Sequence, residues 1–272
     1  MLVAHLTDFH CMPEGTKLGG KLDTNALAAE AVRAVTSSEF SPDVLVVTGD
    51  LTHGADLPAM RAARHAIEQS EIPAFVIPGG HDEYEVFAKV FPEHVTMASA
   101  ETAVLRDEVV GTHRFVCINT LGAGELPGWN EAKSQELDRV LAESPTIPTV
   151  VILHHPPFQC RIAVSTYSRD PEVKWARSLH DVISRHPQVK LMPCGHVHRV
   201  FQRIWAGALV SSGSSTAVQV DPNFKEFWKS ASADQRNFSL VLEPTDFLLY
   251  HWEEPEFTSF VLPLKRDFPR VG

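Results

Sequence analysis

Five short apolar segments of this chain each stop abruptly at a histidine or an aspartate. Continuous runs such as residues 44–48 and 149–153 are typical of strands that are covered on both faces. Between such runs, residues 24–38 and 131–143 carry apolar side chains at helical spacing. Strands alternate with helices up to about residue 200, and mostly short strands follow. This order predicts an α/β layered protein in which parallel strands come first and antiparallel strands close the fold.

The remaining elements follow from the same patterns. Further strands are predicted over residues 2–7, 74–77, 115–118, 189–192, 208–210, 239–242, 247–252 and 259–262. Further helices are predicted over residues 57–69, 83–91 and 172–185. Short strands and turns are expected over residues 96–110, loop over 119–129, and an irregular loop with a short helix over 211–228. Without a repeat or a linker, residues 1–272 are expected to form one domain, with a core over 1–215 and a strand-rich C-terminal part over 216–272.

The charge of the chain argues against one class of partner. The chain carries 24 basic and 34 acidic residues, a net charge of −10 at pH 7, and has no basic run. Non-specific binding of DNA or RNA depends on neutralising phosphates with Lys and Arg, so a nucleic-acid polymer is not the expected partner. A small phosphate-bearing molecule remains open, because a bound cation can supply local positive charge.

The expected location is the cytoplasm. The N-terminus lacks the basic start of a signal peptide, and its apolar run meets His5 and Asp8 too early. No stretch approaches the roughly 18 apolar residues of a membrane span, so no membrane partner is expected. The four cysteines are widely spread and show no Cys-x-x-Cys pair, which argues against a disulfide framework.

The five strand ends supply a set of side chains that can bind metals. They are Asp8-x-His10, Gly49-Asp50, Gly80-His81-Asp82, His154-His155 and Gly195-His196-x-His198. The carboxyl ends of parallel strands lie on one edge of a sheet, so these groups can meet although they are far apart in the chain. In extended backbone, residues i and i+2 point to the same side, so each His or Asp pair is expected to address one centre.

The donor types restrict the metals. Imidazole nitrogens with carboxylate oxygens and no thiolate favour manganese, iron, zinc or cobalt, whereas an all-oxygen set would favour magnesium or calcium. A carboxylate such as Asp50 can bridge two metals, which makes a two-metal site conceivable. Each motif alone is compatible with an ordinary turn, but the five together, each at a strand end, are hard to explain as turns.

The five motifs together resemble the calcineurin-like metallophosphoesterases. The pattern of that family is Asp-x-His, Gly-Asp, Gly-Asn-His-Asp/Glu, a strand-terminal His and Gly-His-x-His, in this order. The resemblance covers residues 1 to about 215. Residues 49–53 and 154–157 look most like the branch of cyclic-nucleotide (class III) and glycerophosphodiester phosphodiesterases. The resemblance implies a four-layer α/β sandwich of two mixed β-sheets flanked by helices.

The resemblance also implies roles for individual residues. One metal would be held by Asp8, His10 and His198, and the other by His154 and His196, with Asp50 as the bridge. A hydroxide made acidic by the metals would attack phosphorus in line. The implied reaction is hydrolysis of a small phosphodiester, foremost a 2′,3′- or 3′,5′-cyclic nucleotide, with glycerophosphodiesters left open.

Two residues of the third motif have implied roles in proton transfer. His81 would not be a ligand but would stabilise charge on the phosphoryl group or protonate the leaving oxygen. Asp82 would orient the ring of His81. Both residues are therefore candidate catalytic residues.

Gly80 departs from the family pattern, because it stands where the family has an asparagine ligand to the second metal. Glycine has no side-chain donor, so we expect the second metal to be held about 10–100-fold more weakly. Two alternatives stay open. One is a binding or regulatory protein on a catalytically weakened scaffold, and the other is a phosphomonoesterase or nucleotidase with a different pocket on the same metals.

Other residues are open between a functional and a structural role. His155 either supports the centre or is merely structural, and His53 is more simply a loop histidine. Three side chains after His154 could contact a phosphate or a base, but they could equally well be solvated side chains without a binding role: Arg161, Tyr167 and Arg169. Three tryptophans are expected to pack rather than to stack on bases: Trp129, Trp205 and Trp228. Relatives are often dimers, so a homodimer through the strand-rich C-terminal part is open as well.

Overall fold

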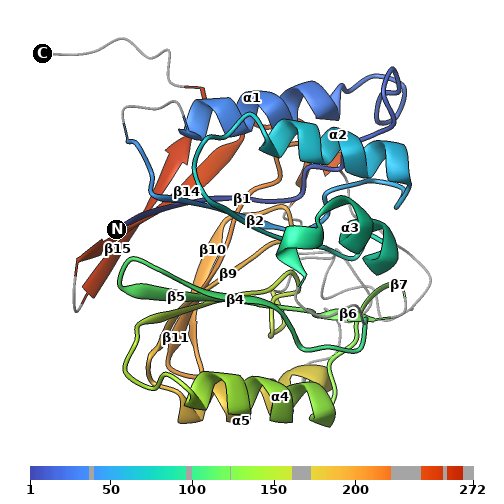
Figure 1. Ribbon diagram of the computed structural model, residues 1–272. Helices are drawn as coiled ribbons and strands as arrows, with labels where there is room; N and C mark the ends of the chain where they lie inside the picture. The colour runs from blue at the N-terminus through green and yellow to red at the C-terminus, as the bar shows by residue number, and fades with distance from the viewer. Residues whose placement is uncertain are drawn as a thin grey trace, which may run out of the picture.

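The computed structural model describes residues 1–36, 40–95, 100–122, 124–160, 173–221, 240–253 and 256–265. Its helices are α1 (Thr24–Thr36), α2 (Leu57–Ile67), α3 (Tyr84–Val90), α4 (Glu131–Ala142) and α5 (Arg177–Arg185). Two sheets face each other, with α1 and α2 over the outer face of one and α4 and α5 over the outer face of the other (Figure 1). The four-layer sandwich of two mixed sheets flanked by helices is thus confirmed.

The first sheet combines both ends of the chain. Its strand order is β15-β14-β1-β2-β3, with β1, β2 and β3 parallel and β14 and β15 antiparallel to their neighbours. The strands are β1 (Leu2–Leu6), β2 (Val44–Thr48), β3 (Ala74–Ile77), β14 (Asp246–Glu253) and β15 (Glu256–Pro263). The C-terminal strands therefore extend the N-terminal sheet beside β1 (Figure 1).

The second sheet has the order β10-β11-β9-β8-β5-β4. Its strands are β4 (Val104–Val110), β5 (His113–Ile118), β8 (Thr149–Ile152), β9 (Val189–Cys194), β10 (Phe201–Trp205) and β11 (Ala208–Ser212). Strands β5, β8, β9 and β11 are parallel, and the edge strands β4 and β10 are antiparallel to their neighbours. Antiparallel strands close the chain as expected, in β14 and β15, and β4 and β5 form a further antiparallel hairpin in its middle.

Several elements differ from the sequence prediction. Strand β4 is a single strand of seven residues where short strands and turns were expected, and β10 was not predicted. Three residues of β10 are exposed, so this edge strand lacks the apolar pattern that marks the buried strands. The predicted loop 119–129 contains the short strands β6 (Leu121–Gly122) and β7 (Gly124–Pro127). The predicted helix 172–185 is α5, preceded by a short 3-10 helix, η3 (Lys174–Ala176).

The core has three hydrophobic layers. The middle layer lies between the sheets and includes Phe75, Phe115 and Tyr250. The outer layers pack one sheet against α1 and α2 and the other against α4 and α5. Strands β2 and β8 are buried along their whole length, as their continuous apolar sequences predict. Among the described residues no helix is long and apolar enough to cross a membrane.

A buried histidine interrupts the apolar middle of the sandwich. His5 in β1 is fully buried, with Nε2 2.9 Å from Thr48 Oγ1 and Nδ1 3.2 Å from the hydroxyl oxygen of Tyr250. Because Thr48 Oγ1 donates to Thr7 Oγ1, it accepts from His5 Nε2, and the Tyr250 hydroxyl donates to Nδ1. Burial lowers the pKa of His5 from 6.5 to about 3, so the ring is neutral in the folded protein.

We expect acid to destabilise the fold through His5. An unfolded histidine binds a proton below about pH 6.5, whereas the buried ring stays neutral until the pH approaches about 3. The free energy of unfolding should therefore fall through this window as the pH decreases, by about 1.4 kcal/mol per pH unit from this residue. Urea unfolding from pH 7 to pH 4.5 should show a shallower fall for His5→Gln than for the wild type. The exposed His65→Gln variant is the control, and equal slopes for His5→Gln and wild type would contradict a buried neutral ring.

Candidate metal centre

The loops that carry the five motifs lie together where the two sheets meet. They follow β1, β2 and β3 in the first sheet and β8 and β9 in the second. Within the first sheet, Asp8 N–H donates to Gly49 O (3.0 Å). Between the sheets, His196 N–H donates to Asp8 Oδ1 (3.0 Å), and within the second sheet Gly195 N–H donates to His154 O (3.0 Å). The sequence prediction that distant strand ends converge therefore describes the geometry correctly.

One cluster contains four of the predicted ligands: Asp8, His10, Asp50 and His198. All four are buried, and one donor atom from each lies within 4.8 Å of the others. The Nε2 atoms of His10 and His198 are 3.0 Å apart. Asp50 Oδ2 lies 3.8 Å from His10 Nε2, and Asp8 Oδ1 lies 3.7 Å from His198 Nε2. Two nitrogens and two carboxylates that converge in this way can coordinate one cation.

A second cluster contains three histidines: His154, His155 and His196. Their donor atoms also lie within 4.8 Å of one another, and all three residues are buried. Asp50 Oδ1 lies 3.3 Å from His154 Nε2, while Oδ2 faces His10 in the first cluster. Asp50 therefore stands between the two clusters with one oxygen toward each.

The backbone of the candidate ligands is strained. Asp8 (φ 54°), His10 (47°), Asp50 (49°), His196 (72°) and His198 (55°) all adopt left-handed conformations. Such conformations cost on the order of 1–3 kcal/mol each for non-glycine residues and are concentrated at functional sites. The extended backbone expected for these pairs is not formed, and although Asp8 and His10 share one cluster, not every pair addresses one centre. In particular, His196 and His198 belong to different clusters.

The glycines beside the ligands allow the loops to pack closely. A Cβ atom on Gly79 would lie 2.1 Å from Asp50 N and 2.3 Å from Asp50 Oδ1. On Gly195 it would lie 2.1 Å from Thr7 Oγ1, and on Gly49 2.7 Å from His154 Nδ1. Such distances are shorter than any real contact, so no side chain fits at these positions without displacing the centre.

The electrostatics of the centre favour a cation beside Asp50. Burial acts against ionisation of Asp50, but His154, together with His81 and His10, outweighs it and holds the pKa of the carboxyl well below its usual range. Burial likewise acts to lower the pKa of His154, yet the Asp50 carboxylate raises it to about 9. Burial lowers the pKa of His10 and of His196 well below the usual value, which keeps these rings in the neutral form that binds metals.

The donor set fits transition-metal ions. Among the described residues, the buried His10 Nδ1 has no hydrogen-bond partner, and the buried His154 Nε2 faces Asp50 Oδ1 at 3.3 Å. Both cysteines beside the ligands are buried thiols, because burial raises the pKa of Cys11 to about 12 and that of Cys194 well above its usual value. The available donors are therefore imidazole nitrogens and carboxylate oxygens, and the residues could hold one or two metal ions.

Asp82 has a different role from the one expected. Its carboxylate accepts hydrogen bonds from the backbone of Leu51 (2.9 Å), Thr52 (2.9 Å) and Gly79 (2.8 Å), and from the Thr52 hydroxyl (2.8 Å). The ring of His81 is not among the hydrogen-bond partners of Asp82 in the described part of the chain. The expectation that Asp82 orients His81 is therefore wrong, because the carboxylate is occupied in joining the loop after β2 to the loop after β3.

His81 is oriented by His53 instead. His81 Nδ1 lies 3.0 Å from the carbonyl oxygen of His53, and the two rings stack with their centroids 5.4 Å apart. The ring of His10 lies 4.8 Å from that of His81, so the half-buried His81 sits directly beside the first cluster. Sequence reasoning treated His53 as a loop histidine. The signal that could have revealed it is its place just after the Gly49-Asp50 motif.

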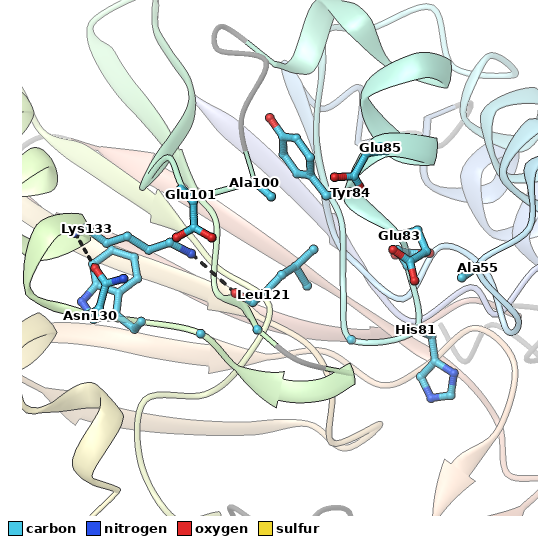
Figure 2. Close-up of a pocket in the computed structure, with 15 residues that line it drawn as sticks. Ala55, His81, Glu83, Tyr84, Glu85, Ala100, Glu101, Leu121, Asn130 and Lys133 are labelled. Atoms are coloured by element: carbon cyan, nitrogen blue, oxygen red, sulfur yellow. Dashed lines mark hydrogen bonds between the residues drawn. The ribbon is translucent and has the colours of Figure 1, made fainter.

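A cavity of about 560 Å³ opens beside the centre. Its lining includes Gly80, Trp129 and three residues that are labelled in Figure 2: His81, Tyr84 and Lys133. Lys133 in α4 is buried, and its ammonium donates to the carbonyls of Asn119 (3.1 Å) and Leu121 (3.5 Å).

The other residues singled out in the sequence are placed only in part. Trp129 is buried, with Nε1 donating to Ser134 Oγ (2.8 Å), and Trp205 packs against the core formed with α4 and α5, as expected. Four residues lie outside the described part of the chain: Arg161, Tyr167, Arg169 and Trp228. The same holds for residues 222–228, the end of the segment 211–228 in which an irregular loop with a short helix was expected.

Comparisons with known proteins agree with this geometry. Residues 1–200 match the family model described as calcineurin-like phosphoesterase. A probable glycerophosphodiester phosphodiesterase of Arcobacter nitrofigilis is 23% identical over 273 residues, which is 99% of this chain and 96% of the relative. A probable cyclic nucleotide phosphodiesterase of Rhodopseudomonas palustris is 30% identical over 210 residues, 74% of this chain and 73% of the relative. A dimetal phosphatase from Danio rerio shares the fold, with a TM-score of 0.66, 98% of both chains covered and 12% identity.

Close packing around Gly79 predicts a position-specific effect of adding a methyl group. Gly79→Ala should lower the free energy of unfolding by about 2 kcal/mol or more, because the new Cβ collides with Asp50. Gly54→Ala is the matched control in the neighbouring loop, since its Cβ would meet Asp56 Oδ2 at an ordinary 3.7 Å. Thermal and urea unfolding of the two variants test this, and equal stabilities would contradict the close approach.

Proposed function

The chain belongs to the calcineurin-like phosphoesterase family, and from this membership we propose that it is a metal-dependent phosphodiesterase of small phosphodiesters. The observation that carries the proposal is the position of Asp50, with one carboxylate oxygen toward each of two clusters of buried imidazoles. His81 lies at the border between these clusters and an open cavity. Metal donors, a titratable group and space for a substrate therefore stand next to one another.

We assign the ligands from this geometry. The first metal would be held by Asp8, His10 and His198, the second by His154 and His196, and Asp50 would be the carboxylate shared by both. Manganese, iron, zinc or cobalt would suit these donors. When bound, the metals would polarise the phosphoryl oxygens and lower the pKa of coordinated water.

His81 acts on the leaving group. Its backbone N–H donates to Asp50 Oδ1 (2.9 Å), which fixes the residue next to the centre. A carbonyl oxygen only accepts, so the contact of Nδ1 with His53 O requires a proton on Nδ1. In the protonated ring, Nε2–H is then the proton that can pass to the departing alkoxide of the substrate.

The cavity receives the organic part of the diester. Its volume of about 560 Å³ is within the range of roughly 300–1,000 Å³ that is usual for small-molecule sites. A diester whose phosphoryl group contacts the centre can extend one substituent past His81 into this cavity, which Tyr84 and Trp129 also line. A cyclic nucleotide is the substrate we favour, and a glycerophosphodiester is the next, because relatives are named for each.

A second candidate function rests on Gly80. A centre with one ligand fewer could serve a binding or regulatory protein with little turnover. Gly80→Asn distinguishes the two functions: a gain of activity from near zero supports the regulatory role, and a modest change supports a working enzyme.

We further propose that the protein is a cytoplasmic homodimer. The four cysteines are free, which fits a reducing compartment. Exposed apolar side chains occur on the C-terminal strands, including Leu240, Phe260 and Val261. They would form the subunit interface, and sedimentation equilibrium measures whether the chain is dimeric.

Activity on a model diester tests the proposed reaction. Protein loaded with Mn²⁺ should hydrolyse bis(p-nitrophenyl) phosphate, and chelation should abolish the activity until Mn²⁺ is restored. Asp50→Asn should lower kcat at least about 100-fold, because a neutral amide cannot bridge two cations. The exposed His65→Gln serves as the control with unchanged activity. Metal-loaded protein that hydrolyses no diester in a panel of cyclic nucleotides and glycerophosphodiesters would sink the proposal.

Substrates whose leaving groups differ in their need for a proton test the role of His81. His81→Gln should slow hydrolysis of a cyclic nucleotide by about 10²–10⁴-fold, because its alkoxide leaving group needs a proton. The same variant should slow bis(p-nitrophenyl) phosphate much less, since p-nitrophenolate leaves without protonation. Steady-state kcat values for both substrates measure the difference. Equal losses on both would show that His81 does not protonate the leaving oxygen.

A further inference from the structure

Gly80 leaves the second cluster without one side-chain donor, and His155 is the residue that the fold brings to this cluster. We propose that the imidazole of His155 is a ligand of the second metal and replaces the donor that Gly80 lacks. This inference rests on the two-metal centre of the proposed function. It adds a metal ligand that the sequence pattern did not assign.

The three histidines of the second cluster face one point. The ring centroid of His155 is 4.8 Å from that of His154 and 4.9 Å from that of His196, and the latter two are 5.2 Å apart. The interplanar angles are 81°, 55° and 82°, so two pairs of rings meet edge to face, the His155–His196 pair is tilted, and none is stacked. His155 is completely buried, as is His154. Three imidazoles arranged in this way present nitrogens to a shared centre.

The hydrogen bonds of the rings follow one pattern. His154 Nδ1 binds the carbonyl oxygen of Thr48 (2.7 Å), and His198 Nδ1 binds that of Val218 (2.7 Å). His155 Nδ1 lies 2.9 Å from Thr120 Oγ1. Metal-binding histidines ordinarily use the second ring nitrogen for such a bond, which sets the tautomer and the ring orientation. When Nδ1–H of His155 donates to Thr120 Oγ1, His155 has support of the same kind as the two assigned ligands, and Nε2 is its ligating atom.

The local sequence explains how two consecutive histidines reach the same cluster. Strand β8 ends at Ile152, so His154 and His155 lie in a bend where side chains no longer alternate between faces. Pro156 restricts the backbone of His155 to extended conformations, which reduces the conformational entropy that the ring loses on binding. Thr120 follows β5, the neighbour of β8, and its hydroxyl group orients the ring of His155 through the contact with Nδ1.

If His155 replaces the asparagine of the family pattern, the second metal receives this donor from a different loop. The family pattern supplies the donor from the loop after β3, whereas His155 supplies it from the loop after β8. Gly80 then lines the cavity without a side chain, next to His81. A metal held in this way would be less covered on the side of Gly80, which lines the cavity in which the substrate is proposed to bind.

Titration of metal-free protein with Co²⁺ tests the assignment without using activity. Absorption in the visible region and metal analysis report the affinity and stoichiometry of each site. His155→Ala should bind the first Co²⁺ as the wild type does and the second at least about 10–100-fold more weakly. Gly80→Asn in the same chain should restore the second affinity. His65→Ala, an exposed histidine away from the centre, is the control with two unchanged sites.

Thr120 provides an independent variant that keeps the imidazole. Thr120→Val removes the hydroxyl that binds Nδ1 and should weaken the second Co²⁺ about tenfold, whereas Thr120→Ser should bind it normally. Unchanged second-site affinity in both His155→Ala and Thr120→Val would overturn the proposal. If His155→Ala loses the second Co²⁺ and Gly80→Asn in the same chain does not restore it, the claim that His155 takes the place of a donor at position 80 is overturned. A wild-type protein that binds a single Co²⁺ would overturn it as well, while the diester assay above decides separately whether the protein is a phosphodiesterase.

Discussion

The buried carboxylate of Asp50 is the group on which the rest of the centre depends. Its oxygens face His10 on one side and His154 on the other, and its Oδ1 also accepts the backbone N–H of His81. An isolated buried carboxylate would be costly, so its charge requires the surrounding imidazoles and a cation. Because His10 follows the first sheet and His154 the second, Asp50 also joins the two halves of the sandwich.

The strain at the centre is offset by the loops around it. The left-handed backbone of Asp8 and Asp50 persists because interloop hydrogen bonds and the absence of side chains at Gly49 and Gly79 hold the turns in place. Polar side chains continue this support into the core. Thr48 Oγ1 donates to Thr7 Oγ1 (2.7 Å), and Thr7 Oγ1 donates to Asp8 Oδ2 (2.8 Å). The neutral His5 below them completes a buried chain of hydrogen bonds that ends at a candidate ligand.

The sequence predicts the layered architecture and the meeting of the strand ends, because continuous apolar strands and their terminal His and Asp residues are local signals. It does not predict the conformation of these residues, since the left-handed turns arise from packing between loops that are distant in the chain. For the same reason the hydrogen bonds of Asp82 to the loop after β2 and the stacking of His53 on His81 were missed. Strand β10 was missed because its exposed residues carry no apolar pattern. The place of His155 beside His154 depends on where β8 ends, which the alternation of side chains along a strand does not reveal.

Location of bound metals in crystals tests the central claim most directly. Crystals of the Mn²⁺-loaded protein, measured at the manganese absorption edge, should show two anomalous peaks on either side of the Asp50 carboxylate. One peak should lie among Asp8, His10 and His198, and the other among His154, His155 and His196. A single peak, or peaks away from Asp50, would contradict the two-metal centre.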